Sequence, residues 1–315
     1  KVVFPEGTSI RIIKAAHIAV SQGIAKPVLL GNSEGIKKMA DEHDVDLTGI
    51  DIIDPVTSEK RMSFAEKYYE KRARKGITLE QAIWMMRDRT YFGMMMLEMG
   101  ECEAVISGVT SDYPNTIKPA LEIISLKEGV SRVSGLFAMI QKDKVYFFAD
   151  TTVNINPTSE ELAEIAISSA NVARAFNIEP KIAMLSFSNF GSARYPESKK
   201  VAEATAIVKR LKPDLVVEGE MQADTALMPE YMAKHFPFSQ LKEEANVLIF
   251  PDLNSGNIAY KLAKRMGGMT AIGPILMGLS KPVHVLHRTL DVNEIVDMVA
   301  IAIVDAQESE RKKKA

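Results

Sequence analysis

Short apolar runs alternate with longer amphipathic segments along the chain, which predicts alternating strands and helices. The first run, residues 2–4, ends in a turn and is followed by a segment with an apolar helical face. The remaining predicted strands lie at residues 27–30, 50–53, 103–108, 145–149, 182–185, 215–219, 246–250, 270–276 and 282–286. Strands that alternate with helices build a parallel sheet, so the pattern predicts an α/β fold.

The length predicts two domains. A chain of 315 residues exceeds what one compact core normally holds. We expect domain I at residues 1–145 and domain II at 146–290, with the final helix, 291–315, returning to domain I. Two lobes joined twice would form an interdomain cleft.

Composition excludes several classes of partner. The chain is 46% hydrophobic and 25% charged with a net charge of −2, which gives no reason to expect nucleic acid or a membrane as partner. No apolar run approaches the ~20 residues of a membrane helix. The single cysteine, Cys102, cannot form an intramolecular disulfide and fits a cytoplasmic protein. Lys1 in place of methionine suggests a piece of a longer protein, and residues 311–314 suggest a frayed basic end.

The segment after the strand at 182–185 is the first candidate binding loop. Its serines and asparagine offer short polar side chains, and Gly191 permits torsions that turn successive N–H groups toward an anion. A simple turn is the alternative. The candidate ligand-binding residues here are Ser186, Ser188, Asn189, Phe190, Gly191 and Ser192.

A second strand leads into a similar loop. Residues 254–257, Asn-Ser-Gly-Asn, precede a predicted helix that carries Lys261 and Arg265 one turn apart. A polar loop at the start of a basic helix suits an anion, which makes Asn257 and Lys261 binding candidates.

Three other segments leave a choice between structure and function. The methionine-rich stripe within 78–100, which includes Trp84 and Met99, is interpreted as core packing. Residues 109–124 form either a loop before a helix near Lys118 or a second ligand-facing loop. The polar cluster within 218–224 lacks the histidine or further aspartate of a metal site, so we expect no metal.

Four motifs in order resemble one known family. They are SFSNFGS, DLVVEGEMQADTAL, ANVLIFPDLNSGNIAYKLAKR and GPILMGLSKPVHVL, and the likeness extends from VVFPEG to VDAQ. The chain is identified by them as a member of the phosphate acetyltransferase family. This resemblance implies interconversion of acetyl-CoA and acetyl phosphate, homodimers or higher homo-oligomers, and a two-domain α/β fold like that of isocitrate and isopropylmalate dehydrogenases.

Finer details resemble the carboxyl-terminal domain of large NADP-dependent malic enzymes. That likeness rests on the SNFGS loop, GEMQADTAL and GPILMGLSKPVHVL. It implies an acetyl-CoA-binding regulatory domain with weak or no acetyl transfer, beside an upstream malic enzyme domain. NADP and a divalent metal are expected only in that upstream domain, and no cofactor is expected in this segment.

The segment LHRTLDVNEIV departs from the family pattern. The resemblance places His287 and Thr289 where the family has serine and glycine, keeps Arg288, and places Glu294 where the family has aspartate. Arginine can hold a phosphate dianion through paired hydrogen bonds, and a carboxylate can act as base for the thiol of CoA. Glu294 can equally form a helix-capping box with Asp291.

His287 either crowds the acetyl position or acts as a base near neutral pH. Lys118 stands where the family tends to have arginine, and Arg87 matches a family position. The preferred hypothesis is therefore the regulatory malic enzyme domain. The alternative is an active phosphate acetyltransferase that uses Arg288 with Glu294 or His287. A dehydrogenase is rejected because no G-x-G-x-x-G follows a strand.

Overall fold

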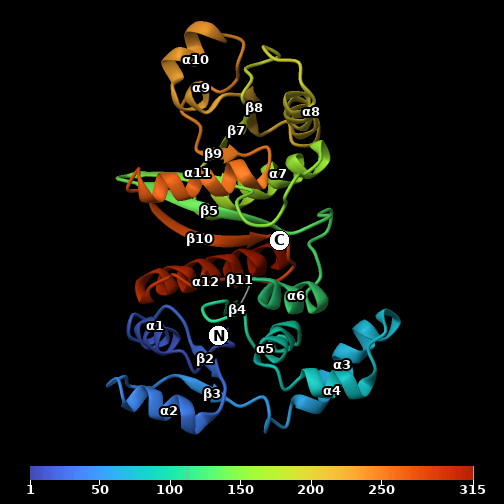
Figure 1. Ribbon diagram of the computed structural model, residues 1–315, viewed down its shortest axis with the longest axis vertical. Helices are drawn as coiled ribbons and strands as arrows, with labels where there is room; N and C mark the ends of the chain where they lie inside the picture. The colour runs from blue at the N-terminus through green and yellow to red at the C-terminus, as the bar shows by residue number, and fades with distance from the viewer. Residues whose placement is uncertain (112, 315) are drawn as a thin grey trace. The chain divides into compact units, whose positions relative to one another are not determined.

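The computed structural model describes residues 1–111 and 113–314. It contains two compact units, one made of Lys1–Lys127 with Leu279–Ala315 and the other of Glu128–Gly278. Figure 1 labels the elements of both units.

The first unit is built on a five-stranded sheet in the order β11-β4-β1-β2-β3, in which every pair is parallel. Val2 of β1 lies opposite Pro27 of β2 and Ala104 of β4. The three central strands are buried at every position, which explains their uninterrupted apolar sequences. The strands are β1 (Val2–Phe4), β2 (Pro27–Leu30), β3 (Asp51–Ile53), β4 (Ala104–Ser107) and β11 (Val283–Val285).

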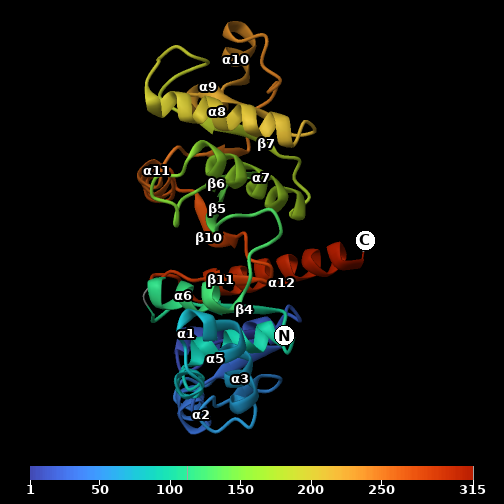
Figure 2. The same ribbon diagram turned by 90° about the vertical axis from the view of Figure 1, so that its right-hand side faces the viewer.

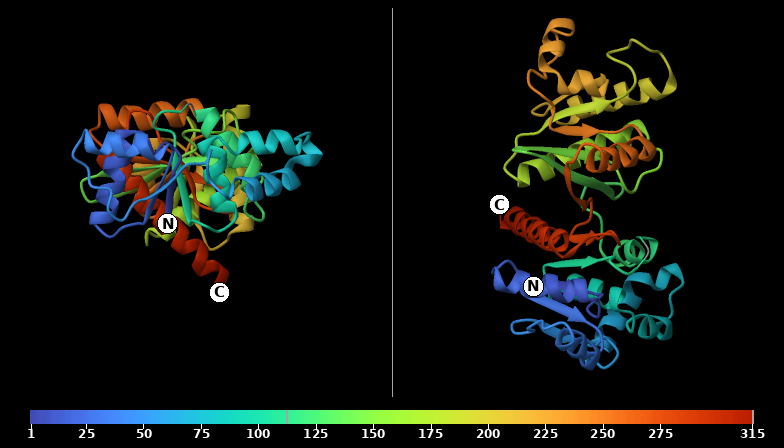
Figure 3. Two further views of the ribbon diagram at one scale, coloured as in Figure 1. Left: turned by 90° about the horizontal axis from the view of Figure 1, so that it is seen from below. Right: turned by 60° about the vertical axis from the view of Figure 1, so that its left-hand side comes forward.

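Two helices of the first unit begin at side-chain caps that the sequence provides. Thr78 and Gln81 form a capping box for α4, and the Asp88 side chain accepts two N–H groups at the start of α5. The final helix α12 contacts α1 and β4, and Figure 3 shows it beside α1. The helices are α1 (Ile10–Ser21), α2 (Ser33–Asp41), α3 (Arg61–Arg72), the 3₁₀ helix η1 (Ala73–Lys75), α4 (Leu79–Met85), α5 (Arg89–Glu98), α6 (Tyr113–Ile123) and α12 (Val292–Lys314).

Three expectations for this unit were wrong. Helix α6 begins at Tyr113 and not near Lys118, so the loop after β4 is shorter than expected. Residues 311–314 continue α12 as helix, with Arg311 paired to Glu308. Within the methionine-rich stripe, Trp84 is 70% exposed and Met99 46% exposed. Both lie near the C-terminal ends of their helices, where neighbouring elements no longer cover the face that carries them.

The second unit contains a mixed sheet in the order β10-β5-β6-β9-β7-β8. β5 pairs antiparallel with both β10 and β6, so the expectation of a purely parallel sheet was wrong here. The β5–β6 hairpin turns within two residues, too few for a crossover helix. The strands are β5 (Ser134–Gln141), β6 (Lys144–Ala149), β7 (Lys181–Leu185), β8 (Val216–Met221), β9 (Val247–Ile249) and β10 (Thr270–Met277).

Helices cover both faces of this sheet. Successive strand residues point to opposite faces, and in β6 the ring of Phe147 lies 6.1 Å from Phe176 at the end of α7. On the other face, Phe137 of β5 stacks on Tyr260 of α11 at 4.2 Å. Figure 2 shows α7 and α8 side by side, as their contacts require. The helices are α7 (Ser159–Ala175), α8 (Pro196–Leu211), α9 (Ala223–Leu227), α10 (Pro229–His235) and α11 (Leu253–Arg265).

The boundaries of the two units differ from those expected for the domains, 1–145 and 146–290. Residues 134–141 pair within the second sheet, and residues 283–285 pair with β4 in the first. Because of this strand pairing, both points at which the chain passes from one unit to the other lie nearer the N-terminus than expected. The final helix α12 is part of the first unit.

Candidate active site

The turn after β11 places the side chain of His287 beside Thr289. The Nδ1 atom of His287 lies 2.9 Å from the Thr289 hydroxyl, and the Thr289 backbone N–H donates to it over 3.4 Å. The hydroxyl can donate to Nδ1 or accept from it, depending on the tautomer of the ring. When Nδ1 accepts, the neutral ring carries its proton on Nε2; a role for His287 as base stays a prediction.

Arg288 is held against the loop that follows β4. Its Nε and Nη2 atoms donate to the carbonyl oxygens of Ser111 and Thr110 at 3.4 and 3.3 Å. Arg11 of α1 donates to the carbonyl oxygens of Arg288 and Leu290 at 2.8 and 2.7 Å. The sequence analysis missed Arg11, which fixes the backbone of this turn.

Glu294 closes a capping box at the start of α12. The Asp291 backbone N–H donates to Glu294 Oε2 at 2.9 Å, and the Glu294 N–H donates to Asp291 Oδ1 at 2.9 Å. The capping interpretation of Asp291 and Glu294 is thus confirmed. A role for Glu294 as base stays a prediction.

The loop Gly108–Ser111 is itself fastened to a residue that the sequence analysis treated only as part of a turn. Its four backbone N–H groups all donate to the carboxylate of Glu6, which follows β1 and is 4% exposed. The available signal was an acidic residue directly after a buried strand.

In the second unit, the backbone N–H groups of the loop after β7 donate hydrogen bonds to other groups of the protein. Gly191 donates to Glu220 Oε1 at 2.7 Å and Phe190 donates to the Glu220 carbonyl at 2.8 Å. The N–H groups of residues 188, 189, 192 and 193 also donate within the loop. In the structure a protein carboxylate and loop oxygens accept these N–H groups, and their predicted use for a bound anion stays a prediction.

The polar cluster within and after β8 includes the side chains that hold this loop. Glu220 also accepts from the Ser188 hydroxyl at 2.8 Å. Gln222 exchanges hydrogen bonds with the Asn189 side chain at 3.1 and 2.8 Å. Glu218 pairs with Lys209 at 2.9 Å. Among the described residues no group of three or more His, Cys, Asp or Glu side chains could hold a metal ion.

The side chains of the loop differ in how accessible they are. Ser188 is fully buried with its hydroxyl engaged, whereas Ser186 is half-buried and Ser192 is exposed. Phe190 packs on Phe236 and Phe238 at 4.8 and 5.0 Å between ring centroids. Binding of a ligand by the polar side chains of this loop stays a prediction.

The second predicted loop is also satisfied internally. Asp252 caps α11 by accepting from Ser255, and the Asn257 side chain donates to the Thr151 carbonyl at 3.0 Å. Lys261 is exposed, with its ammonium 5.8 Å from the centre of the Tyr260 ring. An acidic cap makes this helix start a poor anion site, although Lys261 keeps a positive charge at the surface.

The predicted residues fall into two sets. His287, Arg288 and Glu294 lie around one turn of the first unit, and the exposed Arg87 and Lys118 lie at the end of α4 and within α6 of that unit. Residues 186–192, Asn257 and Lys261 lie in the second unit. The 186–192 loop is joined to β8 through Glu220.

The thiol of Cys102 is expected to be unreactive in the folded protein. Burial raises the pKa of its thiol to about 12, so almost no thiolate is present near neutral pH. No helix in the described part of the chain is long and apolar enough to cross a membrane.

Comparison with known proteins gives a consistent result. The family model described as phosphate acetyl/butaryl transferase matches residues 1–303. The chain belongs to this family. It is 42% identical over 306 residues to a phosphate acetyltransferase of Bacillus subtilis, covering 97% of this chain and 94% of that protein. A phosphotransacetylase structure from Streptococcus pyogenes matches with a TM-score of 0.93 and 42% identity, covering 98% of this chain and 94% of that one.

Other relatives of this family member are longer. The chain is 43% identical over 307 residues to a phosphate acetyltransferase of Nitratidesulfovibrio vulgaris, which covers 98% of this chain but only 44% of that protein. The chain therefore spans less than half of one relative and nearly all of another. The two-sheet α/β fold matches that of solved phosphotransacetylases.

Proposed function

We propose that this chain is a phosphate acetyltransferase that converts acetyl phosphate and CoA to acetyl-CoA and phosphate, and the reverse. The observation that carries the proposal is the match across nearly the full length of the Bacillus subtilis enzyme. The family resemblance described in the sequence analysis also implies that Arg288 is kept. This favours the alternative of the sequence analysis over its preferred malic enzyme hypothesis.

Arg288 would bind the phosphate group. A guanidinium can form two parallel charge-assisted hydrogen bonds with phosphate oxygens and stabilise the charge that develops as phosphate leaves. The CoA sulfur would form a bond to the carbonyl carbon of acetyl phosphate, after which the bond from that carbon to the phosphate oxygen breaks. The phosphate departs with the electron pair of that bond.

Glu294 would take the thiol proton, since a thiol with a pKa of ~8.5 is mostly protonated at neutral pH. His287 suits another part. With its proton on Nε2, it would donate a hydrogen bond to the oxygen that becomes negative when sulfur attacks.

The test is turnover of acetyl-CoA with phosphate by the purified protein, followed as free thiol. Arg288→Ala should lower kcat/KM by on the order of 100-fold or more. Arg74→Ala, which removes an exposed arginine of the same unit, is the matched control and should leave turnover unchanged. Equal losses in the two variants would contradict the role of Arg288.

The second candidate is an acetyl-CoA-binding regulatory domain of an NADP-dependent malic enzyme. It is favoured by the imidazole of His287 and the hydroxyl of Thr289, which lie 2.9 Å apart where the family is expected to have small side chains. Calorimetric binding of acetyl-CoA without turnover would support it. In that case His287→Ser with Thr289→Gly should restore acetyl transfer.

Several details accompany these proposals as predictions from the sequence. They are a cleft between the domains, the isocitrate dehydrogenase-like description of the fold, homo-oligomers and a cytoplasmic location. NADP and a divalent metal belong only to the upstream domain of the second candidate.

A further inference from the structure

The carboxylate of Glu6 receives an unusually complete set of hydrogen bonds. Oε2 accepts from the N–H groups of Gly108 and Val109 at 2.8 and 2.7 Å. Oε1 accepts from the Thr110 N–H and hydroxyl, both at 2.7 Å, and from the Ser111 N–H at 2.9 Å. The side chain of Glu6, which lies at the end of β1, therefore determines the path of the loop after β4.

Charge is needed for this arrangement. Burial raises the pKa of Glu6, but the hydrogen bonds from Thr110, Gly108 and Val109 outweigh it, so the pKa lies below its ordinary value. The group is thus ionised at neutral pH. Five donors converge on two oxygens, which an anionic acceptor tolerates and a neutral amide does not.

The carbonyl oxygens of the same loop are turned toward Arg288. The carbonyl oxygens of Thr110 and Ser111 accept from its guanidinium at 3.3 and 3.4 Å. Arg11 adds a second connection by donating to the Val109 carbonyl at 3.3 Å and to the Arg288 carbonyl at 2.8 Å. A shift of the loop would therefore move the acceptors that orient Arg288.

We propose that Glu6 is a positioning residue for Arg288, acting through the loop Gly108–Ser111. The proposal rests on the proposed phosphate acetyltransferase function, in which Arg288 binds phosphate. Glu6 is buried beneath the loop and its contacts are with protein groups. It acts on the reaction by fixing where the guanidinium stands.

Glu6→Gln tests the proposal at nearly constant shape. The amide NH₂ of glutamine faces N–H donors, so part of the loop loses its acceptor. A displacement of ~1 Å can cost on the order of 100-fold in rate, and we expect a loss of that size in kcat/KM for phosphate. Glu6→Asp keeps the charge and should recover part of the loss; if Glu6→Gln does not fold, Glu6→Asp carries the test.

Combination with Arg288→Ala separates positioning from general damage. If Glu6 acts through Arg288, the double variant Glu6→Gln/Arg288→Ala should be little slower than Arg288→Ala alone. Losses that multiply would overturn the proposal.

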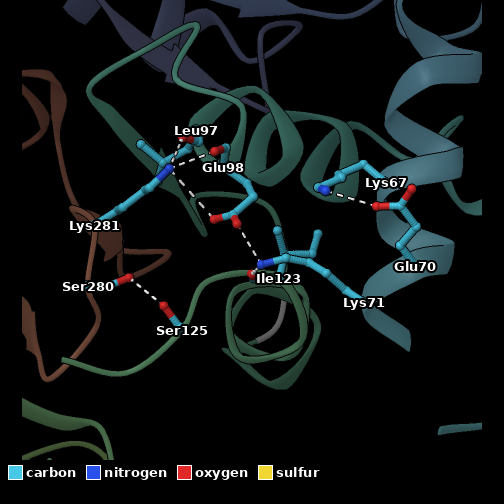
Figure 4. Close-up of polar contacts among 9 residues, drawn as sticks. All are labelled: Lys67, Glu70, Lys71, Leu97, Glu98, Ile123, Ser125, Ser280 and Lys281. Atoms are coloured by element: carbon cyan, nitrogen blue, oxygen red, sulfur yellow. Dashed lines mark hydrogen bonds and ion pairs between the residues drawn. The ribbon is translucent and has the colours of Figure 1, made fainter. Parts of the chain in front are cut away.

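Glu98→Gln is the matched control. Glu98 of the same unit accepts from Lys71 at 2.5 Å and lies 3.7 Å from the ammonium of Lys281, as Figure 4 shows. Its loss should lower stability without changing kcat/KM. A loss of activity equal to that of Glu6→Gln would show that any weakened contact in the unit suffices, and would overturn the proposal.

Hydrogen exchange gives a readout that does not require turnover. The amide hydrogens of residues 108–111 should exchange faster in Glu6→Gln than in the unsubstituted protein, because their acceptor is weakened. Unchanged exchange overturns the proposal for Glu6 whether or not the protein is active. Lack of turnover by the unsubstituted protein would instead overturn the proposed function.

Discussion

Replacing Glu220 with alanine should loosen the loop after β7 and destabilise the second unit. Glu220 is 3% exposed, and its Oε1 accepts from the Ser188 hydroxyl at 2.8 Å and from the Gly191 N–H at 2.7 Å. Alanine removes this acceptor from two donors at once. The two donors differ in their access to water, which sets the size of the effect.

Ser188 is fully buried and cannot replace the lost carboxylate with water. As a donor, its hydroxyl keeps only the longer contact of 3.2 Å with the Ser192 hydroxyl, so we expect a penalty of about 1–3 kcal/mol. Gly191 is exposed, so its N–H can be hydrated at a cost nearer ~1 kcal/mol. Together these predict a loss of about 3 kcal/mol in the free energy of unfolding. For a unit of this size the loss corresponds to a fall of roughly 6–12 °C in Tm.

The assay is urea unfolding followed by circular dichroism, with hydrogen exchange of residues 186–193 as the local readout. Glu244→Ala is the matched control, because its carboxylate also binds two partners, Lys144 at 2.5 Å and Tyr146 at 2.6 Å, but its side chain is 27% exposed. Water can replace those contacts, so the control should lose about 1 kcal/mol or less. Equal losses in the two variants would refute the reasoning.

Three further predictions follow from burial and backbone geometry. Burial lowers the pKa of His284 below its ordinary value of 6.5, so the unfolded chain takes up the proton before the folded chain does as the pH falls. The free energy of unfolding, measured with urea, should therefore decrease as the pH is lowered from about 7.5 to about 5.5. The decrease should be steeper than in His284→Gln. Cys102, with its raised pKa, should react with a disulfide reagent at about pH 8 only after unfolding, as followed by absorbance. Gly191→Ala should lower the free energy of unfolding by only about 1–2 kcal/mol, because the residue has a φ of +84° but its Cβ would lie in open space. Gly256→Ala should lower it more, because the new Cβ would lie 2.3 Å from the Asp150 carbonyl oxygen. Thermal melts of both variants compare the two losses.

Local features of the fold could be predicted because their causes lie within a few residues. The capping box of Thr158 and Glu161 and that of Asp291 and Glu294 both form as their spacing indicated. The buried central strands were recognisable from continuous apolar runs, such as residues 182–185. In each case the residues that determine the feature lie within a few positions of one another in the sequence.

Pairing between distant segments could not be predicted in the same way. The strand Ser134–Gln141 joins β10 across more than a hundred residues, and no local pattern distinguishes an antiparallel neighbour from a parallel one. The interpretation of Trp84 as core failed for a related reason. Helical spacing indicates which residues share a face, but the neighbouring element decides how far along the helix that face is covered.

The loops at the strand ends show why composition alone cannot identify an anion site. Glycine, serine and threonine at the end of a strand suit any negatively charged acceptor, and a carboxylate of the protein itself is such an acceptor. Glu6 accepts the N–H groups of residues 108–111, Glu220 accepts that of Gly191, and Asp150 accepts those of residues 152–154 at 2.8 to 3.1 Å. All three carboxylates are buried. Since these N–H groups already have protein acceptors, the phosphate binding that we propose would use cationic side chains, and Arg288, which contacts the loop that Glu6 holds, is the proposed one.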